Sequence, residues 1–241
     1  MKEGYYEEDS DFMPYYLLQK ELKQKVISYN DIKGEVRYIA GADVAYNDAT
    51  KKMVGALVVL DANTLQVVEQ QVHEMEVTFP YVPGLFSFRE VPPLVEAFKK
   101  LQTKPDLIIC DAHGMAHPNG MGMATHLGLE LDIPTIGCAK SWLVGIYDKS
   151  LLGLERGATQ PMMWDSKIVG VALRTQDNVK PLFVSVGHRV DLQTAIDWVL
   201  KMSPSYRQPE TTRQADHLVN SVMKERMEID FMGDEAVEEP I

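Results

Sequence analysis

The sequence has only two cysteines in 241 residues, and no apolar run reaches the roughly 18 residues that a membrane-spanning helix needs. Cys110 and Cys138 both lie in apolar runs, where cysteine is usually a reduced core thiol, so a disulfide-stapled secreted domain is excluded. The opening residues MKEGYYEEDSDF contain no apolar signal region. We therefore expect a cytoplasmic protein that does not contact membranes.

The net charge of −11 is concentrated at the two ends of the chain. Residues 1–12 carry −4 and residues 225–241 carry −6, which leaves a nearly neutral body at −1. The charge total therefore argues neither for nor against a polyanionic partner. With 45% apolar residues the body can form one sizeable core, so we predict a single catalytic domain over 13–225. We expect acidic, flexible ends at 1–12 and 226–241, and a monomer.

The hydrophobic pattern predicts an α/β protein. Three successive strands joined by short polar turns indicate an antiparallel meander, and the alternating helices and strands that follow indicate parallel pairing with crossovers. This order is typical of a ribonuclease H-like mixed sheet flanked by helices. The predicted strands are Tyr38–Val44, Met53–Asp61, Gln66–Thr78, Leu107–Cys110, Thr135–Ala139, Ile168–Leu173 and Leu182–Val186; the predicted helices are Tyr15–Ile27, Val91–Leu101, Ala124–Leu131, Leu192–Met202 and Thr212–Glu225.

Three acidic residues occur in or next to the predicted elements, and the strand that ends at Asp111 can lie beside the strand that holds Asp43. Asp43 lies within an apolar strand, Asp111 ends another strand, and Glu90 opens a predicted helix. Taken singly, Asp43 fits a salt bridge, Glu90 a helix cap and Asp111 a turn. Together they form the oxygen ligand set that Mg²⁺ or Mn²⁺ prefers. A metal held in this way supports phosphodiester hydrolysis.

The residues at 113–118 do not form a zinc site. His113 and His117 have the spacing of two zinc ligands on a helix, but Gly114 and Pro118 disfavour a helix there, and the glutamate of the H-E-x-x-H motif is missing.

The residues resemble a known family, endonuclease V, the metal-dependent nuclease that recognises deoxyinosine. The order and spacing of the motifs hold from about residue 13 to 225. The matching segments are 41–44 (GADV), 80–90 (PYVPGLFSFRE), 105–111 (PDLIICD), 113–114 (HG), 116–118 (AHP), 126–128 (HLG), 134–140 (PTIGCAK), 187–190 (GHRV), 209–210 (PE) and 212–213 (TR).

The resemblance implies roles for individual residues. Asp43 and Asp111 correspond to the metal-binding pair, with Glu90 a third acid near the metal. Tyr81 corresponds to a wedge that fills the gap left when the inosine base leaves the stack, and flanking prolines stiffen its loop. The further DNA-contacting positions are Pro80, Pro83, Gly84, Leu85, Gly114 and Arg213.

Further roles follow with alternatives open. Lys140 would contact the scissile phosphate or steady the attacking water, or else be a solvated lysine. His117 would bind phosphate or assist proton transfer, or else be a turn histidine bonded to backbone. Asp216 matches a position near the metal, although His217 would take that place if the helix were shifted. Arg213 and Arg189 would contact phosphate or form ion pairs.

The implied activity is Mg²⁺-dependent hydrolysis of the second phosphodiester bond 3′ to a deoxyinosine, leaving 3′-hydroxyl and 5′-phosphate ends, with Mn²⁺ tolerated and other deaminated bases as further substrates. One departure concerns the base pocket: Ala112 stands where the family usually has glycine, and its methyl group would crowd the bound base. Two other functions remain open, an endoribonuclease acting on inosine in RNA and a non-catalytic nucleic-acid-binding module on the same fold.

Overall fold

The computed structural model describes residues 11–47 and 49–235, with only the backbone described for 227–235. Its helices are α1 (Met13–Lys23), α2 (Ser87–Lys100), α3 (Met123–Leu131), α4 (Leu192–Met202) and α5 (Glu210–Glu235), with a short 3-10 helix η1 (Lys149–Leu151). Its strands are β1 (Tyr38–Asn47), β2 (Lys52–Asp61), β3 (Val67–Glu76), β4 (Leu107–Cys110), β5 (Thr135–Ala139), β6 (Thr159–Trp164), β7 (Lys167–Leu173) and β8 (Leu182–His188).

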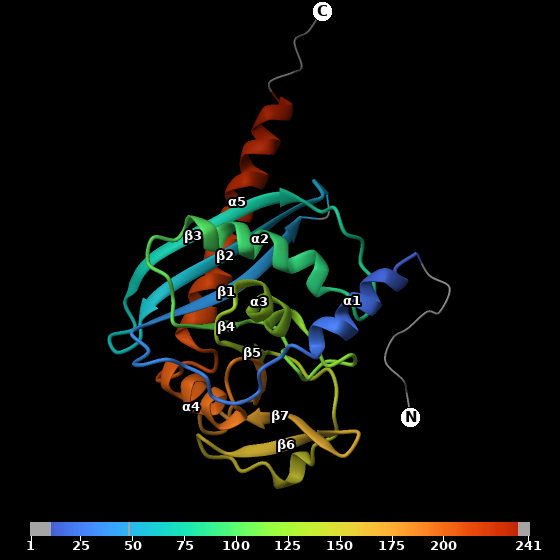
Figure 1. The fold of residues 1–241 in the computed structure, drawn as a ribbon. Coiled ribbons are helices and arrows are strands. Elements are labelled where there is room, and N and C mark those ends of the chain that lie inside the picture. The colour runs from blue at the N-terminus through green and yellow to red at the C-terminus, as the bar shows by residue number, and fades with distance from the viewer. Residues whose placement is uncertain (1–10, 48, 236–241) are drawn as a thin grey trace, which may run out of the picture.

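The eight strands form one mixed sheet in the order β3-β2-β1-β4-β5-β8-β7-β6 (Figure 1). β1, β2 and β3 form the predicted antiparallel meander, and β4 lies parallel to both β1 and β5. The predicted mixed, ribonuclease H-like sheet is thus confirmed. Beyond β5 the pairing is antiparallel again, through β8, β7 and β6.

Several elements differ from their predicted bounds. β6 was not predicted, because it contains Pro161 and its only buried residue is Met162, so it lacks a strand-like apolar period. α2 begins at Ser87 rather than near Val91, and it continues through Pro92 and Pro93, residues that normally stand in the first turn of a helix.

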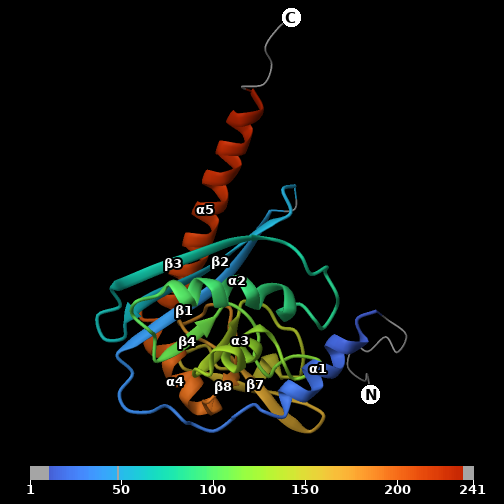
Figure 2. The same ribbon diagram turned by 45° about the horizontal axis from the view of Figure 1, so that its top comes forward.

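The two chain ends are only partly described. α5 stays helical to Glu235, ten residues past its predicted end, so residues 226–235 have a regular backbone rather than an irregular one. The remaining predicted flexible residues, 1–10 and 236–241, lie outside the described part of the chain. In Figures 1 and 2 the later part of α5 extends beyond the sheet. Within residues 11–47 and 49–235, no helix is both long and apolar enough to cross a bilayer.

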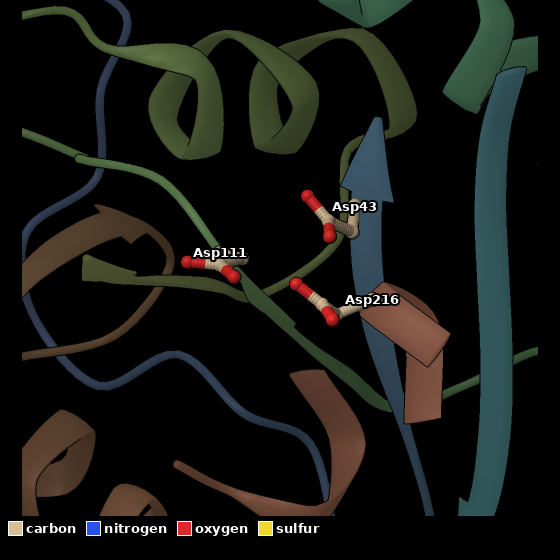
Figure 3. A group of neighbouring side chains, drawn as sticks. All are labelled: Asp43, Asp111 and Asp216. Carbon is tan, nitrogen blue, oxygen red and sulfur yellow. The ribbon is translucent and has the colours of Figure 1, made fainter. Parts of the chain in front are cut away.

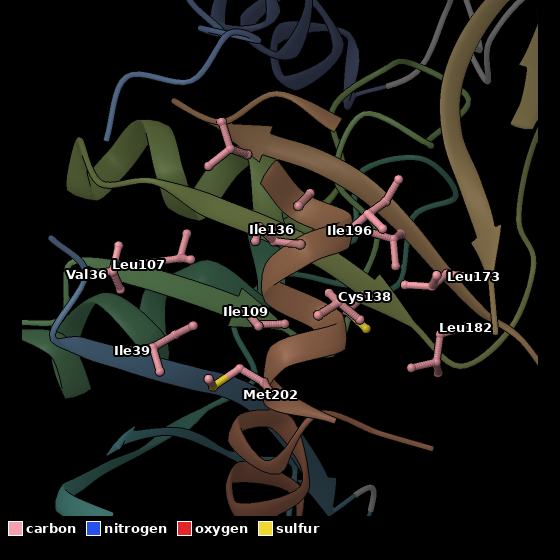
Figure 4. Packing of buried hydrophobic residues seen from close by; sticks show 14 of the residues in the cluster. Val36, Ile39, Leu107, Ile109, Ile136, Cys138, Leu173, Leu182, Ile196 and Met202 are labelled. Carbon is pink, nitrogen blue, oxygen red and sulfur yellow. The ribbon is translucent and has the colours of Figure 1, made fainter. Parts of the chain in front are cut away.

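Helices cover both faces of the sheet. Alternate strand residues point to opposite sides, so each face presents apolar side chains against which helices pack. Ile39 and Ile109 pack with α4 on one face, as Figure 4 shows for this core. Ala40 and Ile108 pack with α2 and α3 on the other face. β4 ends at Cys110 opposite Ala42 of β1, and β1 continues beyond that point to Asn47.

α5 approaches β1 unusually closely at Gly41. A Cβ atom at this position would lie 1.9 Å from the backbone carbonyl oxygen of Thr211, in the first turn of α5. Only glycine permits that separation. The glycine of the GADV segment thus fixes the distance between the strand that carries Asp43 and the helix that carries Asp216.

Candidate active site

Three carboxylates from three separate elements meet at the carboxyl end of β4. Asp43 lies on β1, Asp111 directly follows β4, and Asp216 lies on α5, and their side chains point toward one another (Figure 3). Ala42 pairs with Cys110 in the parallel ladder, which places Asp43 and Asp111 at adjoining positions. One oxygen from each carboxylate lies within 4.8 Å of the others. The group is therefore able to hold a metal ion.

Burial and nearby negative charge make Asp43 and Asp111 reluctant to ionise. Burial and the charge of Asp111 raise the pKa of Asp43 to about 7. Burial also raises the pKa of Asp111, while the Lys140 ammonium opposes that rise. A site in which three negative charges converge is one that a bound cation would stabilise.

Lys140, just past β5, supplies one cation at this site. Its Nζ lies 2.6 Å from Oδ2 of Asp111 and 2.7 Å from Oδ1 of Asp216. The alternative of a freely solvated lysine is therefore wrong. The same contact resolves the position of α5: Asp216 faces the acidic group, whereas its neighbour His217 is exposed.

Glu90 lies in the first turn of α2, beside the carboxylate group. Burial raises its pKa to about 8, and the nearby negative charge of Asp43 contributes to the increase. Tyr46 of β1 is close enough to influence the same carboxyl group. Glu90 is half-buried in the first turn of α2, so its position fits a helix-capping acid and also places it beside the carboxylate group.

Two cavities meet at these acids. One, of about 480 Å³, is lined by Asp43, Val44, Ala45, Tyr46, Glu90, Asp111, Lys140, Asp216, Val219 and Asn220. The other, of about 570 Å³, is lined by Tyr81, Pro83, Gly84, Phe86, Ser87, Glu90, Asp111, Ala112, His113, His117, Pro118, Gly122, Met123, Ala139, Lys140, Ser141 and Leu143. Glu90, Asp111 and Lys140 line both cavities. We call the first the acidic cavity and the second the base cavity.

The Pro-rich loop 80–84 forms one wall of the base cavity. Tyr81 is 70% exposed at its edge, and its ring contacts Phe86 edge-on with 5.6 Å between ring centroids. Pro80 is exposed, and Pro83 and Gly84 line the cavity. A large planar ring therefore projects into solvent beside a cavity.

Two residues predicted to contact DNA, Leu85 and Gly114, are buried in this structure. Leu85 packs with Tyr16 and Val82, beneath the 80–84 loop. The N–H of Gly114 donates to Oγ of Ser185 at 2.9 Å, and an added Cβ would lie 2.1 Å from the Val186 carbonyl oxygen. Both residues therefore support the segments that carry cavity-lining residues, and their contact with DNA stays a prediction.

His117 lines the base cavity as a neutral side chain. Its Nδ1 accepts a hydrogen bond from the backbone N–H of Asn119 at 3.2 Å, and burial lowers its pKa to about 3. The imidazole thus brings no positive charge to a phosphate near neutral pH. The alternative interpretation, a turn histidine bonded to backbone, describes the observed contacts.

The two arginines are held in ion pairs. Arg213 donates to both carboxylate oxygens of Glu210, at 2.8 and 2.6 Å, and lies over the Tyr206 ring. Arg189 pairs with Asp132 at 2.6 Å and with Asp31. The ion-pair alternative is therefore observed for both arginines, and their contact with phosphate stays a prediction.

Sequence reasoning missed several cavity residues. Ser141 and Leu143 follow Lys140 directly, so their closeness to a predicted site residue was an available signal. Phe86 and Met123 gave no signal, because apolar residues at the start of a helix usually belong to the core.

Comparisons with known proteins agree with this site. A family model described as Endonuclease V matches residues 20–217. Endonuclease V from Nostoc punctiforme is 45% identical over 205 residues, which cover 85% of this chain and 92% of the relative. The structure of endonuclease V from Streptomyces avermitilis has a TM-score of 0.83 at 45% identity, covering 89% of this chain and 94% of that one.

A further solved structure contains nucleic acid. Endonuclease V from Ciona intestinalis has a TM-score of 0.79 at 26% identity, covering 90% of this chain and 99% of that one. It is in complex with a 24mer DNA containing an inosine followed by a ribo-adenosine. The family match over most of the chain settles the identity of the fold and the class of activity. This chain belongs to the endonuclease V family and is a DNA-repair endonuclease.

Proposed function

We propose that this protein binds a deoxyinosine in the base cavity and hydrolyses the second phosphodiester bond 3′ to it, leaving 3′-hydroxyl and 5′-phosphate ends. The observation that carries the proposal is that Glu90, Asp111 and Lys140 line both the base cavity and the acidic cavity. A nucleotide held in the base cavity would thus have its strand beside the acidic cavity. Residues 13–225, which hold every residue named in these roles, would form the catalytic domain.

The base cavity suits a base that has left the duplex. Its volume of about 570 Å³ lies in the range of small-molecule sites, and apolar side chains such as Phe86 and Leu143 form part of its lining. Tyr81 stands at its edge and would fill the place of the extruded base, since stacking on an aromatic ring contributes about 1–3 kcal/mol per base. Ala112 also lines this cavity, where its methyl group would restrict which bases fit.

The acidic cavity would hold the metal. Asp43, Asp111 and Asp216 offer only oxygen donors, which fits Mg²⁺ and also Mn²⁺, and Glu90 would complete the surroundings. When bound, such a metal polarises a phosphoryl oxygen and lowers the pKa of bound water. The raised pKa of Asp43 supports this proposal, because crowded carboxylates at one edge are the sign of a site built for positive charge.

Lys140 would serve the scissile phosphate. Its ammonium reaches Asp111 and Asp216 in this structure, so it already lies where a phosphate held at these acids would pass. A preorganised cation at that point stabilises the negative charge that develops during hydrolysis. His117, being neutral, would contribute to the cavity wall and to hydrogen bonding with the bound nucleotide.

An inosine-specific endoribonuclease activity is the second candidate. The Ciona intestinalis relative holds a strand in which a ribo-adenosine follows the inosine. A non-catalytic binding module has less support, because three converging carboxylates would repel a phosphate backbone unless a cation were present.

The test is a cleavage assay with matched end-labelled substrates. A duplex with one deoxyinosine, the same duplex with adenine, and an RNA with one inosine would each be incubated with Mg²⁺ or with EDTA. The proposal expects one product from the deoxyinosine strand, mapped by length to the second 3′ bond, and none with EDTA. Preference for RNA would favour the second candidate, and binding without cleavage in Mg²⁺ and Mn²⁺ would refute both.

A further inference from the structure

Gln19, on α1, is a buried polar side chain whose hydrogen bonds all reach distant parts of the chain. It is only 1% exposed. Its Nε2 donates to the Gly84 carbonyl at 2.8 Å and to the Met121 carbonyl at 3.1 Å, and its Oε1 accepts from Nδ2 of Asn119 at 2.8 Å. The amide group thus uses both its N–H donors and its oxygen.

These partners belong to two opposite segments of the base cavity wall. Gly84 ends the 80–84 loop that carries Tyr81, whereas Asn119 and Met121 lie in the turn between His117 and α3. Gln19 itself does not line the cavity. It therefore joins the two walls from outside.

The loop depends on such external support. Pro80 and Pro83 have no backbone N–H and so donate no hydrogen bond of their own. One helical turn before Gln19, the hydroxyl group of Tyr16 donates to the Pro83 carbonyl at 2.9 Å. The same face of α1 therefore holds two consecutive carbonyls of the loop, and losing these donors would release both carbonyls from α1.

We propose that Gln19 is a positioning residue for lesion recognition, setting the separation between the Tyr81 loop and the 117–122 turn. The role rests on the proposed function, since it requires that the base cavity receive the extruded base. Without Gln19 the two walls would sample several separations. If the binding geometry were then present one-tenth of the time, apparent affinity for the lesion would fall about tenfold.

The test compares Gln19→Met with Gln176→Met. Methionine preserves length and volume but removes the donors and the acceptor. Gln176 is a matched control, because its Nε2 also donates to two backbone carbonyls, Ser203 at 2.8 Å and Tyr206 at 3.1 Å, and it lines neither cavity. Dissociation constants would be measured with Ca²⁺ in place of Mg²⁺, so that a cation offsets the charge of the acidic group, for a deoxyinosine duplex and for the same duplex with adenine.

Gln19→Met is expected to lose about tenfold or more in affinity for the deoxyinosine duplex and to change little with the adenine duplex. When 2-aminopurine is placed beside the lesion, its fluorescence should rise less with saturating Gln19→Met than with saturating wild type, because Tyr81 enters the stack less often. Gln176→Met should retain wild-type values in both measurements. If Gln19 had only a structural role, Gln19→Met, like Gln176→Met, would lower the melting temperature without changing lesion affinity or 2-aminopurine fluorescence.

Two further variants keep the proposal falsifiable. Tyr16→Phe removes the hydrogen bond to the Pro83 carbonyl and should show a smaller loss, about two- to tenfold, even if Gln19→Met folds poorly. Asn119→Ala combined with Gln19→Met should be less than additive, because the two side chains form one network. If folded Gln19→Met kept its affinity for the lesion while the wild-type protein cleaved deoxyinosine DNA, the Gln19 proposal would be overturned and the proposed function would stand. If the wild-type protein did not cleave that DNA, the proposed function itself would be refuted.

Discussion

The close approach of α5 to β1 gives the most direct quantitative prediction. In Gly41→Ala the new methyl group would lie 1.9 Å from the Thr211 carbonyl oxygen, whereas ordinary contact begins at 3.4 Å. The first turn of α5 must therefore move by about 1.5 Å. Asp216 lies on the same helix and Asp43 on the same strand, so the shift separates the two carboxylates.

Both catalysis and metal binding should suffer. Mg²⁺ requires oxygen ligands at about 2.0–2.1 Å with little tolerance, and a misplacement of about 1 Å at an active site costs about 100-fold in rate. We expect kcat/KM on deoxyinosine DNA to fall about 100-fold, and the Mg²⁺ concentration needed for half-maximal activity to rise. Overpacking of this kind also costs about 1–3 kcal/mol of stability, which lowers Tm by a few to about 10 °C.

Gly170→Ala is the matched control. Its Cβ would lie 2.5 Å from the Val184 carbonyl oxygen, which is again a backbone clash, but between β7 and β8 and away from the carboxylates. It should lower Tm to a similar extent and leave kcat/KM within about twofold of wild type. If Gly41→Ala lost only stability and kept both wild-type kcat/KM and metal dependence, the conclusion that this contact sets the acidic group would be refuted.

Three other outcomes are expected. Asp111→Asn should reduce cleavage at least about 100-fold in a single-turnover assay while keeping deoxyinosine binding, and unchanged Mg²⁺-dependent cleavage would contradict its assignment. Tyr81→Ala should weaken lesion binding about tenfold in a titration while leaving the metal dependence of cleavage unchanged, whereas Tyr29→Ala, an exposed tyrosine that lines neither cavity, should change nothing. Burial lowers the pKa of His126 from 6.5 to about 4, so the unfolded chain takes up the proton first as pH falls. Stability should thus be lost between these values, by about 2 kcal/mol at pH 5, and urea unfolding of His126→Gln at pH 7 and pH 5 should show a smaller difference.

The sequence predicted most of the sheet, and for a clear reason. β4 and β5 are short apolar runs bounded by polar or turn residues, so their predicted limits coincide with the observed ones. Asp43 and Asp111 were predicted to lie together because parallel neighbours end at one edge. These features depend on local pattern and on general rules of strand pairing.

Contacts between distant segments were beyond sequence reasoning. One partner of Arg189 is Asp31, 158 residues away, and no local pattern distinguishes that ion pair from a phosphate contact. Burial was equally invisible: Gly114 and Leu85 stand in motif segments, yet the packing of β8 and of α1 covers them. Gly41 was recognised as part of a motif, but only the structure shows which backbone it admits.

The walls shared by the two cavities have a consequence for where the strand is cut. Glu90, Asp111 and Lys140 line both cavities, so under the proposed function the interval between a bound base and the bond that is cut would be fixed by the protein. A poorly fitting base would slow the reaction without moving the incision. The enzyme would therefore measure along the strand from the lesion, and its accuracy would depend on the rigidity of the protein rather than on the sequence of the DNA.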